Sequence, residues 1–277
     1  MRATRLPKQP RVVITGAGSG LGRALALVLA ERHGRLLVSD HNLVSVEETA
    51  RLARDAGASE VRVMACDVTK IEEVEALARA ADDAWGGTDL VANNAGVGIG
   101  GRVGDISLAD WKWTIDVDLW GVIHGCHVFV PRMRKQGSGH VLNVASAAGL
   151  ICGPRMAPYN VAKAGVVALS ETLAAELAGH GVGVTVLCPT FFRTNITRDG
   201  RYTSDKMKQL AEKIMGRATA SADSIARASI ASVERGELYA VPMADGRWLW
   251  RLKRYAPAAY RMLNRTIEKR MMSPTDA

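Results

Sequence analysis

The 277-residue sequence has few cysteines, few aromatic residues and no long hydrophobic run. Its four cysteines are scattered without paired spacing, so we expect neither a disulfide framework nor a metal site. No apolar stretch approaches the roughly 18 residues of a membrane span. The basic segment 1–10 lacks the apolar core of a signal peptide. These absences predict a globular protein of a reducing compartment, most simply the cytoplasm.

The net charge of +8 is concentrated near the C-terminus. The segment 247–270 contains eight basic residues and a single acid, Glu268, so the rest of the chain is nearly neutral. A nucleic-acid-binding protein would be expected to carry a basic stripe or patch on its folded domain. The charge distribution therefore argues against a nucleic-acid partner.

Short apolar runs alternate with longer helical patterns from residue 11 onward. The predicted strands are Arg11–Thr15, Leu36–Ser39, Val61–Ala65, Leu90–Ala92, His140–Val144 and Val182–Leu187. The predicted helices between and after them are Gly20–Arg32, Val44–Asp55, Ile71–Ala84, Leu108–Met133 and Tyr159–Ala178. This alternation predicts an α/β fold, a doubly wound parallel sheet between two helical layers.

The chain divides by composition into three parts. We expect a basic arm over residues 1–10, one folded domain over 11–244 and a basic amphipathic helical extension over 245–277. Within the domain, the polar segment 194–213 has no strong period and is a candidate for a mobile flap. Pro257 is expected to interrupt the helix of the extension.

A glycine-rich segment with the sequence TGAGSGLG begins at Thr15, between a predicted strand and a predicted helix. Glycine lets the backbone approach a pyrophosphate, and the helix N-terminus offers free N–H groups to an anion. The strand–turn–helix setting is the context that a dinucleotide-binding loop requires. The expected cofactor contacts are Gly16, Gly18, Ser19, Gly20, Leu21 and Gly22.

Asp40 ends the second predicted strand, twenty residues after Gly20. A carboxylate there can accept hydrogen bonds from both adenosine ribose hydroxyls, and it would repel the 2′-phosphate of NADP. The nearby candidates for a phosphate-binding residue, Ser19 and His41, are not permanent cations. NAD is therefore favoured over NADP, although Asp40 could equally serve as a cap for the next helix.

Tyr159 and Lys163 lie four residues apart at the start of a helical pattern. This spacing places both side chains on one helix face. A tyrosine with a pKa near 10 is a poor base at neutral pH, and a neighbouring lysine cation lowers that pKa. Taken alone, the pair could equally be a surface contact. Its place after the fifth strand, thirteen residues beyond Ser146, favours a catalytic pair.

Together these features resemble the short-chain dehydrogenase/reductase family in its compact single-domain form. The matching residues occur in order and at family-like spacing. They are Thr15-Gly16-x-x-x-Gly20-x-Gly22, Asn93-Asn94-Ala95-Gly96, Ser146, Tyr159-x-x-x-Lys163 and Pro189. The resemblance implies a Rossmann-type fold of about seven strands, the last at Leu238–Val241 after a helix at Ser221–Glu234. It also suggests a homotetramer or homodimer with Leu108–Met133 and Tyr159–Ala178 at the interface.

The resemblance implies a role for each matching residue. Tyr159 would be the general acid or base on the substrate oxygen, and Lys163 would lower its pKa and bind the nicotinamide ribose. Ser146 would hydrogen-bond the substrate oxygen and stabilise its developing charge. The other implied cofactor contacts are Asp67 and Val68 at the adenine, Asn94, Ala95 and Gly96 along the cofactor floor, and Pro189, Thr190 and Thr194 near the nicotinamide.

Two positions depart from the family pattern. Asp118 stands in Asp-Val-Asp-Leu where the family usually has asparagine, whose backbone carbonyl holds a water of a proton relay. The backbone group survives the substitution, so Asp118 remains a candidate catalytic residue, while its extra carboxylate could alter the charge balance at Lys163. Thr190 follows Pro189 where glycine is common, which affects the local loop geometry.

The substrate-facing segments implied by the resemblance are 97–102, 150–158 and 191–215, and they contain the apolar residues Ile99, Leu150, Ile151, Met156, Phe191 and Phe192. A hydrophobic alcohol or carbonyl compound therefore fits better than a sugar or an acid. For the extension, two alternatives stand. Residues 247–270 could contact an anionic membrane surface, or the helix could pack on its own domain or a neighbouring subunit, which we favour.

The sequence thus predicts an NAD-dependent oxidoreductase that interconverts a hydrophobic alcohol and its ketone or aldehyde. The alternative is a catalytically silent dinucleotide-binding regulator or scaffold, which its basic extension could attach to a membrane. The presence of Ser146, Tyr159 and Lys163 argues against that alternative.

Overall fold

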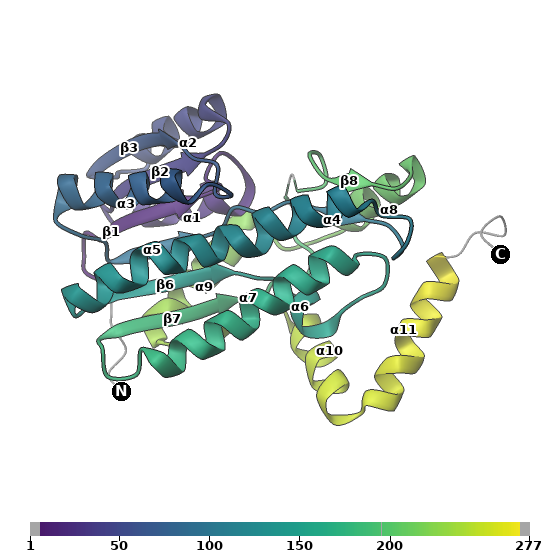
Figure 1. Cartoon of the computed structure of the whole chain (residues 1–277). Coiled ribbons are helices and arrows are strands. Elements are labelled where there is room, and N and C mark those ends of the chain that lie inside the picture. The colour runs from purple at the N-terminus through teal and green to yellow at the C-terminus, as the bar shows by residue number, and fades with distance from the viewer. Residues whose placement is uncertain (1–5, 195, 272–277) are drawn as a thin grey trace.

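The computed structural model describes residues 6–194 and 196–271 and has the expected three-layer α/β/α architecture (Figure 1). Seven parallel strands form one sheet in the order β3-β2-β1-β4-β6-β7-β9. They are β1 (Arg11–Thr15), β2 (Arg35–Asp40), β3 (Glu60–Ala65), β4 (Leu90–Asn93), β6 (Gly139–Val144), β7 (Val182–Leu187) and β9 (Tyr239–Ala240). The direction of winding reverses between β1 and β4, and α/β sheets bind ligands at the carboxyl end of such a switch point.

Two groups of helices cover the two faces of the sheet. One face packs against α1 (Gly20–Ala30), α2 (Leu43–Asp55) and α9 (Ala222–Arg235), and the other against α3 (Ile71–Trp85), α5 (Gly121–Gln136) and α7 (Ala157–Glu176). In β1, Val12 and Ile14 belong to the first core and Val13 to the second. Because alternate side chains point to opposite faces, a strand buried on both sides is apolar throughout.

The predicted helix Leu108–Met133 is confirmed as one unbroken helical stretch that continues to Gln136, and it consists of three consecutive elements. A π-helical turn, η1 (Asp116–Trp120), separates α4 (Leu108–Ile115) from α5. In this turn the Gly121 N–H bonds to the oxygen of Asp116, five residues back. Hydrophobic spacing does not reveal a single widened turn, and such turns are frequent at functional sites.

Segment 194–213, which showed no period, contains regular structure. It holds β8 (Arg201–Tyr202) and most of α8 (Asp205–Gly216). β8 pairs with β5 (Ile99–Gly100) in a second, two-stranded parallel sheet. A two-residue strand is too short to produce a sequence pattern, so neither strand was predicted.

The last residues that the structure describes form two helices, α10 (Ala244–Tyr255) and α11 (Pro257–Met271), a bent pair of which α10 packs beside α6 (Ala147–Ile151) (Figure 1). The bend falls at Pro257, as predicted, because proline fits the first turn of a helix but not its interior. Among the residues that the structure describes, no helix is long and apolar enough to cross a bilayer.

Candidate active site

Tyr159 and Lys163 lie in the first two turns of α7, on one face of the helix. The Lys163 Nζ lies 5.6 Å from the centroid of the Tyr159 ring. It donates a hydrogen bond of 3.1 Å to the backbone oxygen of Val144, the last residue of β6. Lys163 is only 2% exposed, so its cation is fixed at the carboxyl end of the sheet.

Ser146 follows β6 and is the N-cap residue of α6. Its Oγ accepts the N–H of Ala148 at 3.1 Å and lies 3.4 Å from the backbone oxygen of Pro189, to which it can donate. The hydroxyl also forms a side-chain hydrogen bond with Tyr159. The structure therefore brings together the three residues that the sequence placed in a catalytic group.

Two opposing influences act on the acidity of Tyr159. Burial of the phenol and the negative charge of Asp118 raise its pKa above the usual value, whereas the hydrogen bond with Ser146 lowers it. Without a further positive charge, the phenol stays protonated at neutral pH. A cation placed beside it would stabilise the phenolate and lower the pKa.

Asp118 lies in η1 and is completely buried. Its Oδ1 accepts the N–H of Val97 at 2.8 Å and lies 3.8 Å from the Nζ of Lys163. Its Oδ2 is buried and has no hydrogen-bond partner in the described part of the chain. Burial raises the pKa of Asp118 to about 6, although Lys163 and the Val97 N–H favour the ionised form. Burial therefore makes Asp118 easier to protonate, and the nearby Lys163 opposes that shift.

A buried polar network fixes α7 against the sheet. Asn93 at the end of β4 donates to the side-chain oxygen of Asn143 at 2.8 Å, and Asn143 donates to Ser170 of α7 at 3.0 Å. Gly149 allows the approach of α6, since a Cβ there would lie 2.5 Å from the backbone of Lys163. This network leaves no pattern in the sequence, because its members are far apart along the chain.

The glycine loop forms a cradle at the N-terminus of α1. Ser19 is the N-cap residue but makes no side-chain cap hydrogen bond, and the first turn has no acid. The first N–H groups of a helix have no acceptor within it, so they can bind an anion. At Gly16, φ is +65° and a Cβ would lie 2.6 Å from the Cα of Ala95. The geometry fits the pyrophosphate of a dinucleotide.

Asn94, which follows the neighbouring strand β4, holds this loop together with Thr15 at the end of β1. The Asn94 Nδ2 donates to the backbone oxygens of Thr15 and Gly16 at 2.9 and 3.0 Å. In return, the Thr15 Oγ1 accepts the N–H groups of Asn94 and Ala95 at 3.1 and 3.2 Å. Gly96 lies beside the catalytic group, because a Cβ there would be 3.3 Å from the Nζ of Lys163.

The contacts of Asp40 fit both roles expected from the sequence, at the cofactor site and as a cap before α2. Its Oδ2 accepts the N–H of Gly18 at 2.9 Å, and its Oδ1 accepts the N–H of Asn42, which caps α2, at 3.0 Å. The carboxylate therefore borders the cradle and also orders the turn before α2. Arg23, which the sequence analysis did not consider, donates to the backbone oxygen of Gly18 at 2.6 Å. It is a permanent cation near the loop.

Asp67 and Val68 follow β3, next to the end of β2. The Asp67 Oδ1 accepts hydrogen bonds from the N–H and hydroxyl of Thr69 at 3.0 and 2.7 Å. The Val68 side chain is buried, and its backbone oxygen bonds to His124 of α5 at 2.9 Å. Both residues therefore lie at the same edge of the sheet as Asp40, on the adenine side expected for the cofactor.

The residues after β7 connect the site to the end of the chain. Pro189 accepts the N–H of Ala147 at 2.8 Å. Thr190 donates to the carboxylate of Asp245 in α10 at 3.0 Å. Thr194 lies over the glycine loop, since a Cβ on Gly20 would be 2.9 Å from its Oγ1.

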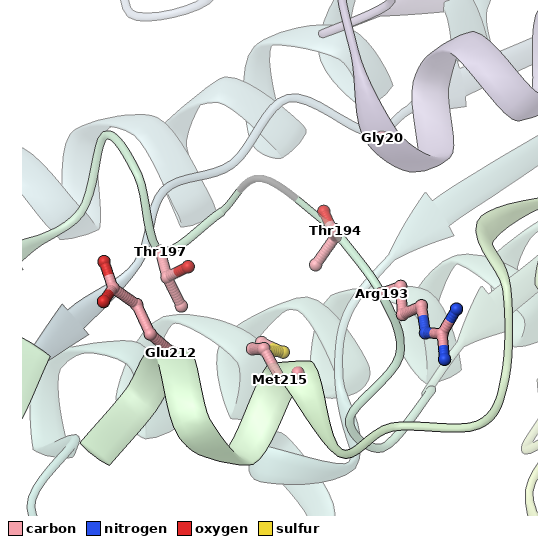
Figure 2. Close-up of a pocket in the computed structure, with 7 residues that line it drawn as sticks. Gly20, Arg193, Thr194, Thr197, Glu212 and Met215 are labelled. Atoms are coloured by element: carbon pink, nitrogen blue, oxygen red, sulfur yellow. The ribbon is translucent and has the colours of Figure 1, made fainter. Parts of the chain in front are cut away.

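A cavity of about 420 Å³ lies between the glycine loop and α8 (Figure 2). Its lining residues are Gly20, Arg193, Thr194, Thr197, Glu212, Met215 and Gly216. Segment 194–213 therefore contributes Thr194, Thr197 and Glu212 to a cavity beside the glycine loop, and a flap over the cofactor remains a prediction.

Comparison with known proteins agrees with this arrangement. Residues 10–205 match the family model described as short chain dehydrogenase, so the chain belongs to the short-chain dehydrogenase/reductase family. A Mycobacterium tuberculosis protein designated an oxidoreductase, SadH, is 35% identical over 255 residues, which are 91% of this chain and 92% of the relative.

Two solved structures are similar over most of the fold. A short-chain dehydrogenase/reductase from Burkholderia phymatum, in complex with NAD, is 34% identical with a TM-score of 0.84, over 92% of this chain and 95% of the other. An alcohol dehydrogenase from Thermococcus sibiricus, in complex with 5-hydroxy-NADP, is 26% identical with a TM-score of 0.71, over 82% of this chain and 91% of the other. Structural relatives thus include complexes with both types of nicotinamide cofactor, and the chain is an oxidoreductase of this family.

Proposed function

We propose that the protein is an NAD-dependent dehydrogenase or reductase that interconverts a hydrophobic alcohol and its ketone or aldehyde. The observation that supports this most directly is the meeting of Ser146, Tyr159 and a buried Lys163 at the carboxyl end of β6, beside the glycine cradle. When bound, the nicotinamide accepts or supplies the hydride. The protein then has to orient the substrate and to accept or donate one proton.

Tyr159 is the general acid or base that transfers that proton. In alcohol oxidation its oxygen removes the hydroxyl proton of the substrate, and in reduction it returns one. Lys163 provides a fixed positive charge 5.6 Å from the ring centroid, which stabilises the phenolate form. Ser146 hydrogen-bonds the substrate oxygen and stabilises the charge that develops there.

The preference for NAD rests on Asp40, which borders the cradle through its bond to Gly18. A second negative charge, such as the 2′-phosphate of NADP, would be repelled there. The Burkholderia phymatum relative, which was solved with NAD, supports the same choice. The Arg23 side chain is directed at the loop backbone and α2, because it donates to the Gly18 oxygen and to Thr49.

The apolar substrate is inferred from the segments that the family resemblance assigns to the substrate side. In these segments Ile99, Leu150 and Phe192 are buried, and Phe191 is 48% exposed. These side chains favour a lipid-like, steroid-like or aromatic compound over a sugar or an acid.

We also propose a homotetramer or homodimer that uses the helices from α4 to α5 and α7. Three large apolar side chains on these helices are exposed, namely Leu108 at 86%, Trp120 at 49% and Val161 at 51%. Exposed apolar patches of this kind favour contact with another subunit. Light scattering of the purified protein measures the oligomeric state, and a monomer would contradict the proposal.

The test of function is a panel of apolar secondary alcohols and ketones assayed with NAD and with NADP. The absorbance of the reduced cofactor measures turnover. We expect turnover of apolar compounds and a higher kcat/KM with NAD. Tight NAD binding without turnover across the panel would contradict an enzyme and favour the silent cofactor-binding protein.

A further inference from the structure

We infer that α11 holds the outer wall of the substrate site through an ion pair between Glu268 and Arg155. We call residues 152–156 the wall segment. It links α6, which begins after Ser146, to α7, which carries Tyr159. The role of the wall segment in binding the substrate rests on the proposed function. The contacts that hold the segment in place do not depend on that function.

Arg155 is the point where three parts of the molecule meet. Its Nε lies 3.1 Å from both carboxylate oxygens of Glu268, and its Nη2 lies 3.0 Å from one of them. Its backbone oxygen accepts the N–H of Gly101 at 2.8 Å, and its Nη1 lies 3.9 Å from the sulfur of Met207 in α8. The side chain is only 8% exposed. The buried Arg155 guanidinium therefore joins α11 to α8, and the Arg155 backbone oxygen joins the wall segment to the segment after β5.

Two further hydrogen bonds link the C-terminal helices to the last residues of α6, directly before the wall segment. The Lys253 Nζ donates to the backbone oxygen of Leu150 at 2.7 Å, and the Tyr260 hydroxyl donates to that of Ile151. The last carbonyl groups of a helix have no partner within it, so α6 requires donors of this kind. α10 and α11 provide them from more than a hundred residues away.

The backbone of the wall segment is unfavourable on its own. Cys152 has φ of +53° and Arg155 has φ of +61°. These values lie in the left-handed region, where a side chain is strained and which few residues other than glycine adopt. Such conformations persist when surrounding contacts determine them. The contacts from α10 and α11 are therefore expected to decide where the wall lies.

The charge pattern of α11 indicates a specific contact. Glu268 is the only acid in the basic segment 247–270, and it faces Arg155, with Arg102 at 3.9 Å. The neighbouring basic residues Arg265 and Lys269 are exposed. We therefore assign Arg155 and Glu268 as positioning residues, which act on the substrate through the wall segment and not by direct chemistry.

The test is Glu268→Gln in the full chain, with Arg265→Gln on the exposed face of the same helix as the matched control. The glutamine keeps the size of the side chain and removes its charge. We expect the KM for the preferred alcohol to rise about tenfold while kcat changes less than about twofold, because substrate positioning is weakened and the chemistry is not. The control should have wild-type constants.

Hydrogen exchange followed by mass spectrometry gives a readout that needs no substrate. Faster exchange is expected in Glu268→Gln at the amides of Gly101 and Cys152, which bond to Arg155 and Ala148. Wild-type exchange there would overturn the inference. Faster exchange with an unchanged KM would overturn the assignment of the wall to the substrate site. If the wild-type protein turns over no compound, the proposed function fails, and exchange alone decides whether α11 holds the segment.

Discussion

The cofactor side and the substrate side of this molecule are held by different kinds of contact. On the cofactor side, short segments meet through backbone groups and small residues, as when Asn94 bonds to the backbone of Thr15 and Gly16. On the substrate side, long side chains join distant segments, as in the pair of Arg155 and Glu268. The first kind of contact suits a cofactor of fixed shape, and the second can vary with the substrate.

The largest expected effect comes from removing the group that transfers the proton while the cofactor contacts stay intact. We expect Tyr159→Phe to lower kcat/KM about a thousandfold, because the proton donor and acceptor is lost. NAD affinity, measured by calorimetry, should change little. Tyr255→Phe is the matched control, since Tyr255 is 80% exposed. Substantial turnover by Tyr159→Phe would show that another group moves the proton.

The next largest effect concerns cofactor choice. Asp40→Asn keeps an oxygen that can accept the N–H of Gly18 or Asn42 but removes the charge. We expect the ratio of kcat/KM with NAD to that with NADP to fall about tenfold, or about 1.4 kcal/mol. Asp55→Asn, at an exposed position on α2, serves as control. An unchanged ratio would mean that Asp40 acts only as a cap.

The pH dependence of activity tests the effect of Asp118 on Tyr159. The Asp118 carboxylate raises the pKa of Tyr159, so Asp118→Asn should lower that pKa. The acid limb of the kcat/KM profile for alcohol oxidation should therefore move to lower pH, because the phenolate forms more readily. At its optimum the variant should remain within about tenfold of wild type. Loss of nearly all activity would show that the carboxylate itself carries the proton.

The smallest expected effect is on membrane contact. α10 and α11 pack through Lys253 and Tyr260 onto the domain, although Trp248 and several arginines on them remain exposed. We expect sedimentation with anionic and with neutral vesicles to differ by less than about twofold. Strong, salt-sensitive sedimentation with anionic vesicles, lost on removal of residues 245–277, would favour a membrane-binding extension.

The contrast between the two sides also explains what the sequence could predict. The sheet, most of the helices and the glycine loop were predictable because hydrophobic period and glycine spacing are local signals. The grouping of Ser146, Tyr159 and Lys163 followed from the resemblance to a family, and the structure places these residues together.

Other features left no local signal. The π-helical turn at Asp118 widens one turn within an otherwise helical stretch, which the apolar pattern did not reveal. Two sets of contacts join residues that are far apart along the chain and meet only in the folded structure. They are the network of Asn93, Asn143 and Ser170 and the pair of Arg155 and Glu268. Contacts of this kind required the structure.

Transfer of a labelled hydride tests the central claim most directly. The best alcohol of the panel is prepared with deuterium on its carbinol carbon and incubated with NAD and the enzyme. We predict that mass spectrometry finds one deuterium in the reduced cofactor, and none within the same time for Tyr159→Phe. Reduced cofactor without deuterium, or equal labelling by Tyr159→Phe, would contradict the account.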